Sequence, residues 1–270
     1  MSIEAPKPLL EVQNLDVTLK KRNTFFKVLD DLSFRVYPGE ILGLVGESGA
    51  GKSMTGSAIL GLIEKPLFIS KGEIIFNGQR IENNAISVRG SLISMVFQDP
   101  LISLNPLRRI GEQLVETIRT HINFDKRQAI TYAKNLLEEV GIDKHRFHDY
   151  PHTFSGGMRQ RVVIALALAP KPSLIIADEP TTALDVSVQA QILALLKRLC
   201  KERGTSIILI THDMGVIAET ADRVGVLYSG RLAEIGSSSE VLSNPMHPYT
   251  QGLIAATPRI DPETLEKKLY

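Results

Sequence analysis

The sequence predicts an α/β fold in which the strands of a parallel sheet alternate with helices along the chain. A block of further helices is inserted between two of these strands. Apolar runs rich in β-branched residues occupy 93–97, 174–177 and 207–210, each bounded by polar residues. Such runs are typical of buried parallel strands. Residues 100–169 have a mostly helical pattern between the first two runs, which indicates a helical subdomain inserted into the sheet domain.

The N-terminal part of the chain shows a different, antiparallel pattern. Residues 9–19 alternate well enough to form a strand, and residues 32–36 suggest a second one. Residues 72–81 predict a hairpin, because Asn77-Gly78 supplies the positive φ angles of a tight turn. We therefore expect an N-terminal antiparallel β subdomain ahead of the parallel sheet.

The C-terminal part predicts one more hairpin and then a tail. Residues 223–236 read as a hairpin around Ser229-Gly230, and residues 258–270 are polar and expected to be loosely held. The length of 270 residues suffices for one large α/β domain, or for a core with a smaller subdomain.

Composition narrows the classes of function. The formal net charge of +1 gives no global basic field that would indicate binding to nucleic acid or anionic lipid. A single cysteine, Cys200, excludes an internal disulfide and fits a reducing compartment. The longest apolar run, 162–169, is far shorter than the roughly 20 residues that span a bilayer. Residues 1–8 carry no secretory signal. We expect a soluble, non-exported protein whose membrane role, if any, depends on a partner.

A glycine-rich loop follows the apolar run 41–45 and precedes a helix-compatible stretch, 54–60. This strand–loop–helix setting is the one that a P-loop requires, because glycines let backbone N–H groups turn towards phosphate oxygens at a helix N-terminus. Lys52 would reach the β- and γ-phosphates, and the Ser53 hydroxyl would ligate Mg²⁺. We expect a P-loop NTPase core whose nucleotide-binding residues are Gly46, Glu47, Ser48, Gly49, Ala50, Gly51, Lys52 and Ser53.

Two further predicted strands end in polar side chains that suit hydrolysis. Residues 173–180 read S-L-I-I-A-D-E-P, so that Asp178 can bind Mg²⁺ and Glu179 can polarise a water aimed at the γ-phosphate. The next strand ends at His212, which can hydrogen-bond the γ-phosphate and hold that water. Ligands bind at the carboxyl ends of strands in such sheets, so we expect Glu179 and His212 to be catalytic.

A second candidate phosphate site lies at the start of another helix. Residues 154–158 read Phe154-Ser155-Gly156-Gly157-Met158, and a Ser-Gly-Gly at a helix N-terminus offers backbone amides, a hydroxyl and the helix dipole. The plainer alternative is an ordinary N-cap. Two phosphate-binding devices on one chain cannot easily converge on one ligand. Two copies are therefore expected to sandwich a nucleotide head to tail.

At this point the chain resembles an ATPase subunit of the ABC transporters, over about residues 9–258, and specifically the oligopeptide/dipeptide/nickel importer family. Residues 46–53 resemble Walker A and 173–179 resemble Walker B. Gln98, in the segment F-Q-D-P, resembles the Q-loop glutamine that reaches Mg²⁺. Residues 154–158 resemble the signature motif, Ala183-Leu184-Asp185 the D-loop, and His212 the switch histidine.

The importer branch is suggested by short motifs outside the phosphate site. These are Asp99-Pro100 with S-L-N-P at 103–106, Y-P-H at 150–152 and N-P-M-H-P-Y-T at 244–250. The resemblance implies a RecA-like core in one nucleotide-binding domain, 1–258, with the helical subdomain at about 100–169 and a tail at 259–270. It implies ATP and Mg²⁺ as cofactors, with Ser53, Gln98 and Asp178 serving the metal.

The resemblance also implies partners and a place in the cell. These are a second, related ABC ATPase subunit, two transmembrane permease subunits, and indirectly an extracytoplasmic substrate-binding protein, at the cytoplasmic face of a bacterial inner membrane, with no nucleic acid. The expected cargo is short peptides, with nickel, opines or glutathione as alternatives. A soluble ABC-type ATPase acting on nucleic acid or ribosomes would carry heptads or a repeat, and neither is present. A P-loop kinase is a third alternative, and it is disfavoured because residues 155–157 would have no function in such an enzyme.

Two features depart from the family pattern. The family usually places an aromatic residue against adenine, and the matching position here is Leu19, with Phe25 or Phe26 as possible substitutes. Many longer members end in a cysteine cluster, whereas this chain stops at Tyr270 with only Cys200, so we expect a short or truncated member.

Overall fold

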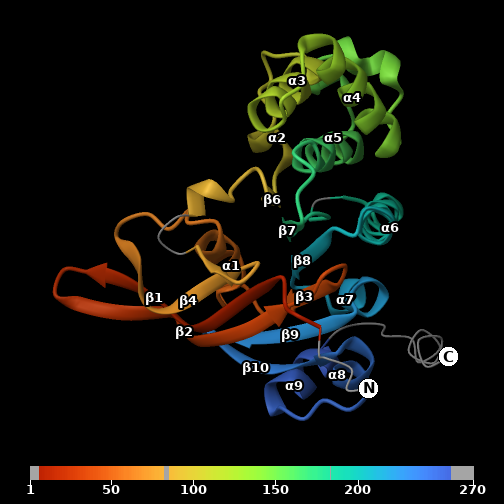
Figure 1. Ribbon diagram of the computed structural model, residues 1–270. Coiled ribbons are helices and arrows are strands. Elements are labelled where there is room, and N and C mark those ends of the chain that lie inside the picture. The colour runs from red at the N-terminus through yellow and green to blue at the C-terminus, as the bar shows by residue number, and fades with distance from the viewer. Residues whose placement is uncertain (1–5, 82–84, 183, 257–270) are drawn as a thin grey trace, which may run out of the picture.

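The computed structural model describes residues 6–81, 85–182 and 184–256, and its centre is a six-stranded sheet (Figure 1). The strand order is β10-β9-β3-β8-β7-β6, with parallel pairing from β9 to β6 and an antiparallel edge between β10 and β9. The bounds are β3 Ile41–Val45, β6 Ile93–Val96, β7 Leu174–Asp178, β8 Ser206–Thr211, β9 Arg223–Tyr228 and β10 Arg231–Ser237. The predicted parallel strands and the C-terminal hairpin are thus confirmed.

The sheet is covered on both faces, which explains why its strands read as continuous apolar runs. Every residue of β3, β7 and β8 is buried. Along β3, Ile41 and Val45 join one core cluster, and Leu42 and Leu44 join the other. The first cluster includes side chains of α6 (Val186–Arg203) and α7 (Met214–Thr220), and the second includes α1 (Lys52–Ile59). Two short helices, α8 (Ser238–Ser243) and α9 (Pro248–Ala256), follow β10.

A second, antiparallel sheet lies on the α1 side, in the order β2-β1-β4-β5. Its strands are β1 Leu10–Lys21, β2 Thr24–Val36, β4 Leu67–Phe76 and β5 Gln79–Arg80. Asn77 (φ 49°) and Gly78 (φ 76°) form the predicted β4–β5 turn. The prediction for β2, 32–36, was too short. Residues 24–27 are all exposed, so their pairing with β1 leaves no alternating pattern in the sequence.

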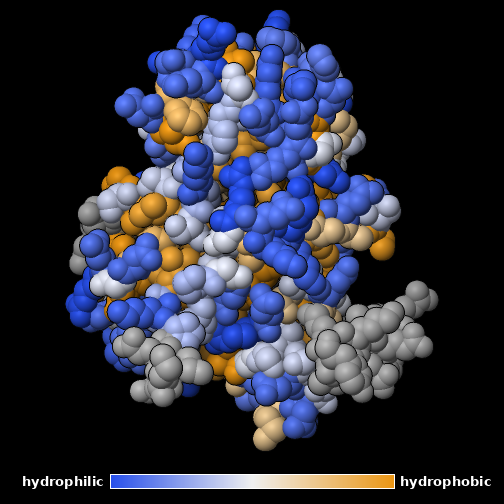
Figure 2. All heavy atoms as spheres, turned by 45° about the vertical axis from the view of Figure 1, so that its right-hand side comes forward, coloured by the Kyte–Doolittle hydropathy of each residue, from blue (hydrophilic) through white to orange (hydrophobic). Residues whose placement is uncertain are grey.

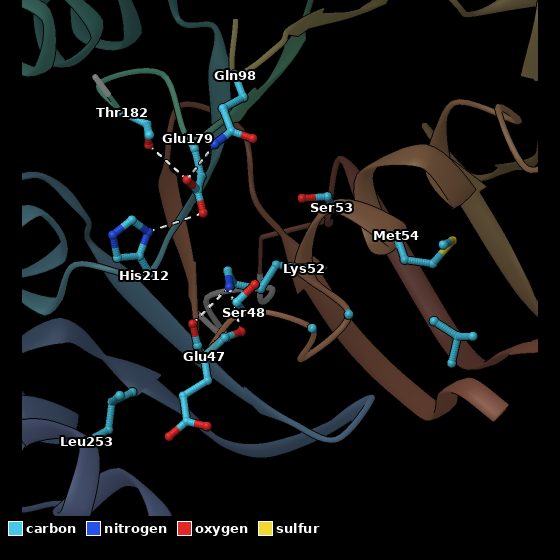
Figure 3. Close-up of a pocket in the computed structure, with 14 residues that line it drawn as sticks. Glu47, Ser48, Lys52, Ser53, Met54, Gln98, Glu179, Thr182, His212 and Leu253 are labelled. Carbon is cyan, nitrogen blue, oxygen red and sulfur yellow. Dashed lines mark hydrogen bonds and ion pairs between the residues drawn. The ribbon is translucent and has the colours of Figure 1, made fainter. Parts of the chain in front are cut away.

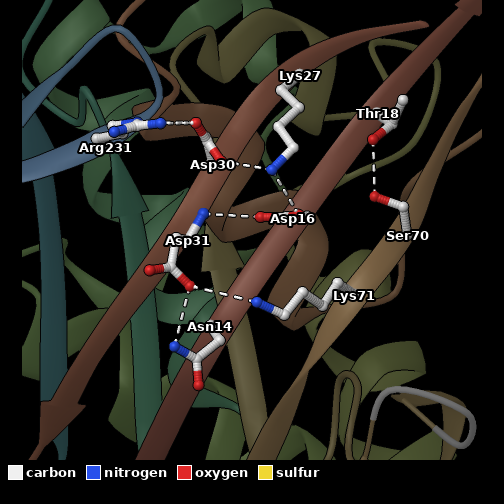
Figure 4. Close-up of polar contacts among 9 residues, drawn as sticks. All are labelled: Asn14, Asp16, Thr18, Lys27, Asp30, Asp31, Ser70, Lys71 and Arg231. Carbon is white, nitrogen blue, oxygen red and sulfur yellow. Dashed lines mark hydrogen bonds and ion pairs between the residues drawn. The ribbon is translucent and has the colours of Figure 1, made fainter.

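A polar network joins this antiparallel sheet to the central one (Figure 4). The buried Asp16 carboxylate accepts a hydrogen bond from the Asp31 N–H at 2.7 Å and pairs with Lys27 at 2.9 Å. Lys27 also pairs with Asp30 at 2.6 Å, and Asp30 pairs with Arg231 of β10. Burial alone would raise the pKa of Asp16, but the Lys27 and Asp31 contacts outweigh it and lower that pKa.

Between β6 and β7 the chain forms a helical lobe, at the top of Figure 1. Its α-helices are α2 Pro100–Ser103, α3 Ile110–His121, α4 Lys126–Glu139 and α5 Gly156–Leu168, and short 3-10 helices lie at Lys144–His148 and Pro151–Thr153. A capping box of Asp125 and Gln128 starts α4. Apolar side chains of α3, α4 and α5 belong to the first core cluster of the sheet, so the lobe packs onto that face.

Candidate nucleotide-binding site

The glycine-rich loop connects β3 to α1 and keeps the start of that helix open. Gly51 is the N-cap residue with φ 102°, and no side chain caps the helix. A Cβ at Gly51 would lie 2.6 Å from the Leu29 side chain, and one at Gly46 would lie 2.2 Å from the Leu227 carbonyl oxygen. Glycine is therefore required at both positions by close packing. The first-turn N–H groups of α1 remain available to an anion.

Lys52 lies in the middle of this loop. Its Nζ donates hydrogen bonds to the carbonyl oxygens of Gly46 at 2.8 Å and Glu47 at 2.9 Å (Figure 3). Burial lowers the pKa of Lys52, and the nearby carboxylates of Glu179 and Asp178 partly offset that effect. The loop thus holds a largely desolvated cation against its own backbone.

Asp178, the last residue of β7, faces the start of α1. The Ser53 hydroxyl donates a hydrogen bond to Asp178 Oδ1 at 2.9 Å. Burial raises the pKa of Asp178, the Glu179 charge adds to that effect, and Ser53 and Lys52 oppose it. This contact joins two motifs that are 125 residues apart in the sequence.

Glu179 is the meeting point of three segments (Figure 3). Its carboxylate accepts hydrogen bonds from Thr182 Oγ1 at 2.8 Å and Gln98 Nε2 at 3.2 Å, and it contacts His212 Nδ1 at 3.2 Å. Burial would raise the pKa of Glu179, but the Thr182 and His212 contacts and the charges of His212 and Lys52 lower it. The group is therefore a carboxylate at neutral pH, next to the loop.

These residues open onto one cavity of about 790 Å³. Ten of the predicted site residues line it: Gly46, Glu47, Ser48, Gly49, Gly51, Lys52, Ser53, Gln98, Glu179 and His212. Ala50 is buried behind the loop, and Asp178 lies behind Ser53. Four lining residues were not predicted, namely Val28, Met54, Thr182 and Leu253. The only sequence signal for Thr182 is its hydroxyl three residues after Glu179, and the three apolar residues carry none.

The three residues considered for contact with adenine, Leu19, Phe25 and Phe26, lie in the β1–β2 hairpin. Leu19 pairs with Phe26 across the strands. Phe25 is 61% exposed, with its ring edge-on to Phe68. Neither Leu19 nor Phe25 lines the cavity, whereas Val28 of the same strand does. Their contact with adenine stays a prediction.

The second predicted phosphate site lies in the helical lobe. Ser155 is the N-cap of α5, and its hydroxyl accepts a hydrogen bond from the Met158 N–H at 3.4 Å. Gly156 and Gly157 belong to the first turn of that helix, and the buried Phe154 packs under the Arg146 guanidinium. None of residues 154–158 lines the cavity next to Lys52. The ordinary N-cap is thus present. A phosphate-binding role for these residues would require a second nucleotide, separate from the one next to Lys52.

The predicted D-loop residue Asp185 caps another helix. Its carboxylate accepts a hydrogen bond from the Val188 N–H at 2.9 Å at the start of α6. Leu184 approaches the first turn of α5, since a Cβ on Gly156 would be 3.5 Å from its side chain. Ala183 lies outside the described residues.

Comparison with known families and proteins gives two matches along the chain. A family described as "ABC transporter" matches residues 29–182, and one described as "Oligopeptide/dipeptide transporter, C-terminal region" matches residues 233–269. The first match contains the segments that resemble Walker A, the Q-loop glutamine, the signature and Walker B. The second contains the N-P-M-H-P-Y-T motif.

Individual proteins agree with these matches. The oligopeptide transport ATP-binding protein OppD of Bacillus subtilis is 48% identical, over 94% of this chain and 73% of its own length. OppD of Salmonella typhimurium is 47% identical, over 97% of this chain and 81% of its own length. The dimeric ATP-binding cassette MJ0796, solved with ADP and phosphate, superposes with a TM-score of 0.75 at 26% identity, over 85% of this chain and 98% of that one.

Proposed function

Because this chain belongs to the ABC transporter ATPase family, and within it to the oligopeptide and dipeptide transport ATP-binding proteins, we propose that it hydrolyses ATP to drive the uptake of short peptides across a membrane. The observation that carries the proposal is the convergence of Lys52, Gln98, Glu179 and His212 on one cavity. A cation for phosphates, an amide, a carboxylate base and a histidine are the groups that ATP hydrolysis requires.

Each side chain takes a defined part in this proposal. The loop N–H groups and Lys52 bind the phosphates, and Glu179 accepts the proton of the attacking water. The lowered pKa of Glu179 keeps it ionised for that purpose. His212 contacts Glu179 at 3.2 Å, so it can orient the same water and the γ-phosphate. The reaction then depends on positioning rather than on a covalent intermediate.

Mg²⁺ fits the donor set near Ser53. The Ser53 hydroxyl and Asp178 carboxylate lie 2.9 Å apart, and the Gln98 amide lies on the same cavity, so that hard oxygen ligands predominate. We propose that Ser53, Asp178 and Gln98 hold the ion. When bound, it would neutralise charge on the β- and γ-phosphate oxygens.

We further propose that two ATPase subunits, this chain and a related partner, close head to tail on ATP. Ser155 to Gly157 begin α5 in the helical lobe and do not line the cavity of their own chain (Figure 1). In a head-to-tail pair these residues would complete the partner's site. MJ0796, a structural neighbour, was solved as a dimer.

The membrane partners are proposed to be two permease subunits, with an extracytoplasmic binding protein acting through them. No helix in residues 6–81, 85–182 or 184–256 could itself cross a membrane. The face drawn in Figure 2 is mostly hydrophilic, with small separate apolar patches. Large apolar side chains are exposed after β6, at Phe97, Leu101, Ile102 and Leu107, and Phe97 also lines a hollow of about 360 Å³ between the sheet and α5. We propose this segment as the permease contact, at the cytoplasmic face of the inner membrane.

The test is to purify the chain with its cognate partner ATPase and permease subunits, reconstitute them in vesicles and supply the extracytoplasmic binding protein. We expect ATP hydrolysis that Lys52→Ala abolishes, and ATP-dependent transport of labelled di- and tripeptides. Parallel assays with nickel, an opine and glutathione identify the cargo alternatives. Recovery of ribosomes, instead of transmembrane proteins, from a detergent pull-down would contradict the importer role.

A further inference from the structure

The C-terminal helix α9 reaches the phosphate-binding loop directly. The Tyr249 hydroxyl accepts a hydrogen bond from the backbone N–H of Glu47 at 3.1 Å, across 202 residues of sequence. One turn further along α9, Leu253 lines the nucleotide cavity (Figure 3). The catalytic scheme above gives this helix no role.

The start of α9 is fixed to the central sheet. The Glu234 carboxylate on β10 accepts hydrogen bonds from the N–H groups of Met246 at 2.8 Å and His247 at 3.1 Å. The N–H of Tyr249 donates to His247 Nδ1 at 3.1 Å. The Tyr249 ring packs against Tyr228, at the end of β9, with centroids 4.4 Å apart. Tyr249 is therefore held by its backbone, by its ring and by its hydroxyl.

Glu47 is held from two directions. Its N–H is bound by Tyr249, and its carbonyl oxygen is bound by Lys52 Nζ at 2.9 Å. A phosphate that engages Lys52 must draw that ammonium group away from the carbonyl. The Tyr249 contact need not change, because the hydroxyl lies in a separate small hollow formed with Tyr228, Ser229 and loop residues 47–50.

We propose that Tyr249 is a positioning residue for nucleotide binding, which fixes the Glu47 end of the loop while Lys52 moves to the phosphates. The C-terminal segment 244–256 would in this way set the shape of the phosphate-binding loop. This inference rests on the proposed ATPase function, since it presumes that the loop binds ATP.

The test is Tyr249→Phe, which removes the hydroxyl and keeps the ring against Tyr228. We expect the Kd and the KM for ATP to rise about three- to tenfold, because without this bond the free loop is no longer held in its binding conformation and ATP binding must order it. The kcat should change less than about twofold, because the bond is equal in the ground and transition states. The matched control is Tyr228→Phe, which removes the other hydroxyl of the ring pair and should leave Kd unchanged.

Melting temperatures without nucleotide separate positioning from folding. They should differ by no more than about 4 °C among wild type, Tyr249→Phe and Tyr228→Phe, as loss of one hydrogen bond allows in a chain of this size. Glu234→Ala, which leaves both tyrosines in place but releases the start of α9, should weaken ATP binding in the same direction. Equal Kd values for wild type and Tyr249→Phe would overturn the inference, as would equal weakening by Tyr228→Phe. Failure of the wild-type chain to bind ATP would instead overturn the proposed function.

Discussion

Glu179 combines an unusual backbone with three side-chain contacts. Its φ of 46° lies in the left-handed region that side chains other than glycine rarely adopt. The contacts with Gln98, Thr182 and His212 come from three separate segments. Strained backbone of this kind persists where the surroundings over-determine it, typically at functional sites.

Glu179→Gln keeps the shape of this side chain and removes its ability to accept a proton. We expect ATP to bind with near-normal affinity while turnover falls by about 100-fold or more. Single-turnover hydrolysis and equilibrium nucleotide binding measure the two effects separately. Glu116→Gln, at an exposed glutamate of the helical lobe, is the control and should retain full turnover. Near-normal turnover in Glu179→Gln would show that Glu179 is not the catalytic base.

The sequence predicts a candidate site residue when that residue belongs to a short motif whose members are close together in the chain. Lys52 and Ser53 follow from the glycine-rich motif, and Glu179 follows from an apolar strand that ends in carboxylates. Thr182 and Tyr249 could not be found this way. Their roles depend on where the turn after β7 and the helix α9 fold back, and Tyr249 meets Glu47 from 202 residues away.

At the scale of elements, predictability follows burial. The strands β6, β7 and β8 are completely or nearly completely buried, so their apolar runs predict the bounds to within one residue. The first part of β2 is exposed and is held mainly by pairing with β1, which no side-chain pattern records. The second candidate phosphate site, at the start of α5, is within its own chain a helix N-terminus capped by Ser155.

The two signature glycines differ in what surrounds them. A Cβ on Gly157 would lie 2.3 Å from the Val188 side chain of α6, whereas one on Gly156 would meet only Leu184 at 3.5 Å. Gly157→Ala should therefore push α5 away from α6 and cost about 1–3 kcal/mol of unfolding free energy. Gly156→Ala should be near neutral for folding, and Gly157→Ala with Val188→Ala should recover most of the loss. Denaturant titration checks all three, and equal stability of the two alanine variants would contradict the packing argument.

The network around Asp16 predicts a pH-dependent contribution to stability. The pKa of Asp16 is lowered in the folded chain, so its stabilising effect is fully present above the unfolded pKa of about 3.9 and is lost as the pH falls further. Asp16→Asn should cost about 1 kcal/mol at neutral pH, and this difference should shrink below about pH 4. Urea unfolding at several pH values measures it.

Asp31→Asn is the matched control for that experiment. Asp31 belongs to the same network, but its side chain is 60% exposed, and its Oδ1 lies 3.7 Å from Lys71 Nζ. Exposed pairs of this kind contribute little to stability. A constant difference between Asp16→Asn and wild type down to pH 3 would show that the charge of Asp16 does not act through folding.

At the scale of the whole molecule, the two candidate phosphate-binding devices lie in different lobes. The P-loop precedes α1 in the sheet lobe, and Ser155 begins α5 in the helical lobe (Figure 1). In the proposed head-to-tail pair, one chain would therefore offer half of each of two sites. This arrangement makes closure of a pair of subunits, rather than motion within one, the expected response to ATP.

Ser155→Arg places a bulky cation at the edge that a partner's ATP would meet. We expect this chain to bind ATP at its own P-loop with unchanged Kd, while hydrolysis at the opposing site stops. In the Glu179→Gln background, ATP should shift a mixture of this chain and its partner subunit to a dimer on size-exclusion chromatography. Ser155→Arg in this chain should prevent that shift. Ser155→Ala, which removes only the cap hydroxyl, is the conservative comparison. Loss of nucleotide at Lys52 in the Ser155→Arg chain would contradict the head-to-tail arrangement.

Because no side chain caps the start of α1, a bound phosphate would contribute to the stability of the folded chain. With Gly51 as N-cap and no side chain to take the first N–H groups, the bound phosphate would act as the missing cap. At ATP concentrations about 100 times the Kd, binding adds about 2.7 kcal/mol to the free energy of unfolding. A cell that runs short of ATP would therefore hold a less stable protein, exposed more often to proteases. The energy supply would then influence how long the subunit survives, as well as how fast it works.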